Sequence, residues 1–108
     1  MQHLFVTYEI AKKLKELGFD RLCFTYFFAG TNDLYNGTVR MYNFNKGLET
    51  SAPLWQQAID WFYDNHEILI VQIPSYSMKV WEVSKKGNKD VISGLSINKA
   101  IEEAIKLI

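Results

Sequence analysis

Three segments of the chain have apolar residues at the three- and four-residue spacing that places them on one face of a helix. These segments are residues 8–17, 55–64 and 97–108. Thr7, Ser51 and Ser96 precede them, and each has a side-chain oxygen that can accept a hydrogen bond from a free amide of the first helical turn. A cap at Ser51 places Pro53 in the first turn, where proline lacks only an amide that has no helical partner. The pattern predicts three capped amphipathic helices.

Two of these helices also have predicted ends. Gly18 stands where the chain leaves the first helix and where a left-handed residue is favoured, and Phe19 then follows in position to contact Leu14, as in a Schellman motif. Asn65 is the predicted left-handed terminator of the second helix, because asparagine tolerates that conformation better than most residues.

Five other segments have the composition or alternation of β-strands. They are residues 21–28, 38–44, 68–73, 78–84 and 91–95. The first has Phe and Tyr on both faces, which predicts a strand that is central in the sheet or covered on both sides. Turn residues separate the strands, and Tyr35, Asn36 and Gly37 leave the register of the first hairpin open.

The elements follow one another as αββ, then αββ with a short fifth strand, then a final helix. Strands joined by short turns pair antiparallel. We therefore expect an α+β fold in which an antiparallel sheet of four or five strands packs against three helices, with residues 1–108 forming a single domain. Three amphipathic helices exceed what one face of a small sheet covers, so one apolar helix surface is expected to cross an edge, use the second face or meet a partner.

Composition narrows the functional classes. The chain has 108 residues, of which 48% are hydrophobic, and its twelve basic residues balance twelve acidic ones. Zero net charge argues against a generic phosphate binder, which gains affinity by displacing counterions, and it makes self-association easier. A single cysteine, Cys23, fits a reducing compartment. With no signal-peptide pattern and no long apolar run, we expect a cytoplasmic protein that does not enter a membrane.

The sequence contains no recognisable catalytic or metal-binding motif. No Gly-rich nucleotide pattern is present, and the only nitrogen or sulfur ligands, His3, His66 and Cys23, fall on different elements. Cys23 is expected to be a buried, small apolar residue. An enzyme would need a pocket that converges on Cys23, His66, Asp33 or Asp60. We therefore expect no enzyme activity, no cofactor and no metal.

Aromatic residues on the predicted strands offer an alternative function. A stacking surface for single-stranded nucleic acid could be formed by Tyr26, Phe28, Tyr42, Phe44 and Trp81. The same strands supply only three basic residues, Arg21, Arg40 and Lys79. Nucleic-acid binding is therefore the second hypothesis, and aromatic packing in the core beneath the helices is the favoured explanation.

One resemblance extends over most of the chain. Residues 51–62 combine a Ser-Ala-Pro cap, Gln-Gln, an apolar residue and Asp-Trp, and His66 closes the same helix. This segment, with residues 9–20 and 100–108, resembles short uncharacterised phage or prophage proteins of gut bacteria. Asn65 departs from the Gly or Lys often found near that helix end. The resemblance implies a mobile-element accessory protein and nominates no catalytic residue.

The leading hypothesis is a non-enzymatic, phage-type protein that binds a host or phage protein. Its predicted exposed anchors are Trp55, Trp61, Tyr63 and Tyr76, because Trp and Tyr are frequent interface hot spots. A homodimer is compatible with every hypothesis.

Overall fold

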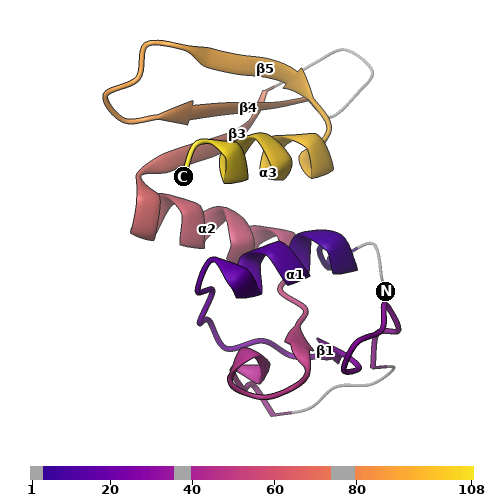
Figure 1. The fold of residues 1–108 in the computed structure, drawn as a ribbon. Helices are drawn as coiled ribbons and strands as arrows, with labels where there is room; N and C mark the ends of the chain where they lie inside the picture. Colours follow the sequence, from indigo (N-terminus) through magenta and orange to yellow (C-terminus); the bar gives the residue numbers. More distant parts are fainter. Residues whose placement is uncertain (1–3, 36–39, 74–79) are drawn as a thin grey trace. The chain divides into compact units, whose positions relative to one another are not determined.

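The computed structural model describes residues 4–35, 40–73 and 80–108, which contain three α-helices and two antiparallel sheets (Figure 1). The α+β class is confirmed. The described strands belong to a two-stranded and a three-stranded sheet, whereas we expected a single sheet. The chain divides into two compact units, residues 1–57 and 58–108, and we describe each by itself. The single-domain organisation stays a prediction.

In unit 1, helix α1 (Tyr8–Glu16) has both of its predicted ends. The Thr7 hydroxyl accepts a hydrogen bond from the amide of Ile10 at 3.4 Å. Gly18 has φ +92°, the amide of Gly18 donates to the Lys15 carbonyl, and the amide of Phe19 donates to the Leu14 carbonyl. These two bonds are those of a Schellman motif, so this prediction is confirmed.

The strands of unit 1 are shorter than predicted and pair differently. Strand β1 (Tyr26–Phe27) pairs antiparallel with β2 (Thr50–Ser51) and, through Phe27, with Leu34 on its other side. The first hairpin therefore returns at Leu34, because the turn closes with the amide of Phe28 donating to the Asp33 carbonyl.

The predicted strand at residues 38–44 is mostly absent from the described part of the chain. Tyr42 forms one isolated antiparallel bridge to Cys23, and residues Phe44–Lys46 form a short 3-10 helix, η2. The side chain of Asn43 accepts a hydrogen bond from the amide of Asn45, which favours this turn over a continued strand. Residues 36–39 lie outside the described residues.

Helix α2 (Trp55–His66) begins at the predicted apolar segment, but its cap and its end differ from the prediction. Ser51 is not its cap, because Ser51 belongs to β2 and pairs with Tyr26. Instead, the side-chain oxygen of Gln57 accepts a hydrogen bond from the amide of Leu54 at 2.9 Å, which is half of a capping box.

The predicted terminator of α2 is also wrong. Asn65 lies within the helix, where its side-chain amide donates to the Trp61 carbonyl. The left-handed residue is Glu67, with φ 55°, and the amide of Glu67 donates to the Tyr63 carbonyl. This single hydrogen bond is that of an αL helix ending formed by a residue other than glycine.

In unit 2, three strands form an antiparallel sheet in the order β3-β4-β5. Strands β3 (Ile68–Ile73) and β5 (Val91–Leu95) have the predicted bounds, and β4 is described over Val80–Lys85. The predicted turn at residues 74–77 and the first two residues of the predicted fourth strand lie outside the described residues.

Helix α3 (Ile97–Lys106) packs along this sheet (Figure 1). The predicted cap is confirmed, since the Ser96 hydroxyl accepts a hydrogen bond from the amide of Lys99 at 3.3 Å. Ile101 and Ala104 are fully buried, as are Ile68 and Val83 in the sheet. At the other end of the helix, the ammonium group of Lys85 donates to the Leu107 carbonyl at 2.8 Å.

Candidate interaction surface

Five aromatic rings of unit 1 form a connected cluster, which we call the aromatic cluster: Tyr26, Phe28, Tyr35, Tyr42 and Phe44. The rings of Tyr26 and Tyr35 stack with their centroids 5.2 Å apart, and the ring of Phe44 lies 4.7 Å from that of Tyr26. Phe28 contacts Tyr26 edge-on, and Tyr42 contacts Phe44 in the same way. Residues from three segments of the chain therefore meet in one set of rings.

Both ends of the aromatic cluster are open to solvent. Phe28 is 44% exposed and Tyr42 is 53% exposed, while the three rings between them are half-buried. The neighbouring segments add further exposed apolar side chains, namely Leu22, Phe24, Met41 and Leu48.

The exposure follows from a one-sided pattern in residues 22–28. Cys23, Thr25 and Phe27 are buried, whereas the alternate residues Leu22, Phe24 and Phe28 are exposed. The prediction that this strand is covered on both sides is therefore wrong. Aromatic residues on both faces indicated a central strand, but only one face enters the core of unit 1.

Polar side chains connect the irregular segments around the cluster. The Asn45 side chain donates to the Phe19 carbonyl at 3.0 Å and accepts from the amide of Ser51 at 2.8 Å. The Lys15 ammonium group donates to the carbonyls of Gly47 and Glu49. These bonds join segments that are distant in sequence, so side-chain hydrogen bonds replace much of the missing strand pairing in unit 1.

Three of the four predicted anchors are described, and they differ in their exposure to solvent. Trp55 is half-buried, and Trp61 is only 3% exposed because it packs edge-on against Phe62 and His66. Trp61 is therefore wrong as an exposed anchor. Tyr63 is 58% exposed, and Tyr76 lies outside the described residues.

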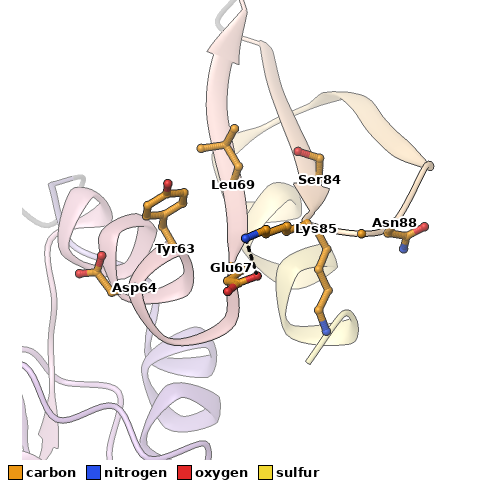
Figure 2. A pocket seen from close by; sticks show the side chains of 9 residues that line it. Tyr63, Asp64, Glu67, Leu69, Ser84, Lys85 and Asn88 are labelled. Atoms are coloured by element: carbon orange, nitrogen blue, oxygen red, sulfur yellow. Dashed lines mark ion pairs between the residues drawn. The ribbon is translucent and has the colours of Figure 1, made fainter.

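Tyr63 instead lines a hollow of about 630 Å³ at the start of β3 (Figure 2). Leu69 and Ser84 share this hollow with the turn after β4, and the ammonium group of Lys86 lies 3.9 Å from the carboxylate of Glu67. The side chains of this ion pair are both largely exposed, so it contributes little to stability.

The residues considered for catalysis differ in burial. Cys23 is buried, as predicted, and its burial raises the pKa of the thiol from 9.0 to about 12, so the thiolate nucleophile is scarce at neutral pH. Asp33 is exposed in the turn after β1, Asp60 is exposed on α2, and His66 contacts Trp61. None of the four lines the hollow beside Tyr63 or a second hollow of about 260 Å³ beside the start of α1.

Two further properties concern the described residues only. No three His, Cys, Asp or Glu side chains among them are grouped so as to hold a metal ion. No helix within these ranges has the length and apolar content needed to cross a membrane.

Sequence reasoning named four of the five rings of the cluster and missed Tyr35. The sequence left the hairpin register open at Tyr35, whose amide donates to the Tyr26 carbonyl and continues the hairpin. The signal was the short turn at residues 29–33, which closes a hairpin at Leu34 without any need for residues 38–44. Trp81, the remaining aromatic residue named from the sequence, belongs to β4 in unit 2.

Comparisons of the chain with models of protein families, with curated proteins and with solved structures each find no match.

Proposed function

We propose that the protein is a non-enzymatic accessory protein of phage or mobile-element origin that binds another protein through the aromatic cluster. The observation that carries this proposal is the solvent exposure of Phe28 and Tyr42 at the two ends of a connected set of rings. Aromatic residues that are already packed lose little conformational freedom on binding, which favours them as anchors.

The composition of the surface favours a protein partner. Leu22, Met41 and Leu48 are exposed in the same unit, and aliphatic and methionine side chains contribute to protein interfaces but do not stack on bases. The partner that fits is a protein with an apolar depression or groove able to cover rings, because the cluster itself carries no charged member.

Truncation of the two exposed rings tests the proposal. Partners are captured from a lysate of the host bacterium, identified by mass spectrometry, and titrated as purified proteins against wild type, Phe28→Ala and Tyr42→Ala. Each truncation is expected to weaken binding about tenfold or more, as for interface hot spots. Tyr63→Ala is the matched control, because Tyr63, like Tyr42, is a tyrosine that is more than half exposed, but it belongs to unit 2. Equal losses in all three variants, or no loss in the first two, would contradict the proposal.

Single-stranded nucleic acid is the second candidate ligand, since Tyr26, Phe28, Tyr42 and Phe44 do converge. Base stacking on aromatic rings tolerates any sequence, but such sites also follow the backbone with basic groups. Titration of a fluorescein-labelled oligothymidine at low salt separates the candidates by anisotropy. Saturable, salt-dependent binding that Tyr42→Ala abolishes would favour nucleic acid over a protein partner.

A further inference from the structure

The two edges of the three-stranded sheet differ in how they are protected. Strand β5 is interrupted by a bulge, because Ser93 and Gly94 lie opposite the single residue Glu82, and Gly94 has φ 79°. Bulges of this kind twist an edge away from further pairing. The edge formed by β5 is therefore a poor template for another strand.

Strand β3 lacks any such protection. Its six residues pair with β4 in continuous register from Ile68 to Ile73, and no other strand among the described residues pairs with its outer edge. The strand contains neither a charged residue nor a proline, the two residue types that most often block edge pairing. Its outer backbone groups are therefore a template for another strand.

We propose that β3 pairs antiparallel with β3 of a second copy of this chain about a two-fold axis, which joins two three-stranded sheets into a six-stranded one. The inference is independent of the proposed function. Zero net charge leaves little long-range repulsion between two copies. An antiparallel pair of identical strands is self-complementary, as a two-fold interface requires.

The side chains of β3 select the register. Ile68 and Ile70 point into the core of unit 2, whereas Leu69, Val71 and Ile73 alternate onto the other face, where Leu69 is 44% exposed. A register centred on Val71 places Leu69 opposite Ile73 of the second copy and Val71 opposite its equivalent. All three outward residues then have apolar cross-strand neighbours. A register centred on Ile70 would instead place Ile73 opposite Glu67.

This register also keeps both cores on the same side. Directly opposed residues of an antiparallel pair point to one face, so Ile70 lies opposite Gln72 of the second copy and the two α3 helices cover the same face of the joined sheet. In this register the outward apolar residues of the two copies oppose one another, and both α3 helices lie on the same face of the joined sheet.

Light scattering after size-exclusion chromatography tests the pairing over a dilution series. Wild type is expected to have twice the 12.6 kDa mass of one chain. Val71→Lys should give the mass of a single chain, because two ammonium groups would meet at the axis. Val91→Lys, at a 51% exposed position on the other edge, is the matched control and should remain a dimer. A monomeric wild type overturns the proposal. Binding of another protein to the chain would not change this conclusion.

Cross-linking provides a readout that does not depend on how Val71→Lys folds. Opposed Cα atoms in an antiparallel pair lie about 4.5–5.5 Å apart, which a disulfide can span. Val71→Cys should therefore form a covalent dimer under mild oxidation, while Val91→Cys and wild type, whose Cys23 is buried, should not. A dimer that persists in folded Val71→Lys, or equal cross-linking at residues 71 and 91, would overturn the β3 pairing.

Discussion

Gly18 has a backbone conformation, φ +92°, that side chains disfavour, while an added Cβ would meet no atom within 4 Å. The cost of a side chain there is therefore conformational and not steric. Gly18→Ala is expected to lower the free energy of unfolding by about 1 kcal/mol, measured by urea denaturation. Gly47→Ala is the control: Gly47 does not have a positive φ, and the atom nearest the added Cβ belongs to the flexible Glu49 side chain. A loss as large in Gly47→Ala would contradict this explanation.

Cys23 couples stability to alkaline pH. Burial raises the pKa of its thiol from 9.0 to about 12, so between these values the unfolded chain loses a proton that the folded chain retains. The contribution of the neutral thiol to the free energy of unfolding is complete below pH 9. It is lost as pH rises towards 12, and the free energy of unfolding falls by at most about 1.4 kcal/mol per pH unit.

Cys23→Ala is therefore expected to lose less stability than wild type between pH 9 and the onset of alkaline unfolding. The quantity to compare is the slope of unfolding free energy against pH, since the truncation also leaves a cavity that lowers stability at every pH. Equal slopes for wild type and Cys23→Ala would show that the thiol has the same pKa in the folded and the unfolded chain, which would contradict the prediction.

Helix α2 ends at an unusual residue for its conformation. Glu67 has φ 55°, and its exposed ion pair with Lys86 contributes little. Glu67→Gly is expected to raise the free energy of unfolding by up to about 1 kcal/mol, because glycine adopts this conformation without strain. Glu67→Ala keeps the strain and should change stability by less than about 0.5 kcal/mol. Thermal denaturation of both variants distinguishes backbone strain from the loss of the ion pair.

At the scale of elements, prediction succeeded where local signals agreed. Residues 68–73 form a strand with the predicted bounds because five of the six are apolar, all except Gln72, and the whole segment pairs with a regular neighbour. Residues 21–28 had similar composition but formed only the two-residue β1, since their partners are short segments from distant parts of the chain. Strand length thus depended on the available partner.

Unit 1 as a whole depends on polar side chains that reach across the sequence. Asn45→Ala would remove bonds to the Phe19 carbonyl and to the amide of Ser51, a residue that is 1% exposed. We expect a loss of about 2–3 kcal/mol in unfolding free energy, because two hydrogen bonds are removed and the buried amide of Ser51 loses its side-chain acceptor. Asn88→Ala removes one hydrogen bond within an exposed turn and should cost less than about 1 kcal/mol. Similar losses in the two variants would contradict this role of Asn45.

By itself, the sequence determined the features that depend on neighbouring residues: the three helices, the caps at Thr7 and Ser96, the Schellman motif at Gly18 and the bounds of β3 and β5. Hydrogen bonds and apolar periodicity within a few residues are sufficient to specify these features. The burial of Cys23 was likewise predictable from its apolar neighbours.

Only the tertiary structure decided which face of each segment reaches solvent. It buried Trp61, exposed Phe28 and Tyr42, added Tyr35 to the aromatic cluster and divided the strands between two sheets. The physical reason is that an aromatic residue has the same local preference in a core and on an interface. Its burial depends on contacts with residues far away in the sequence, which the local pattern does not encode.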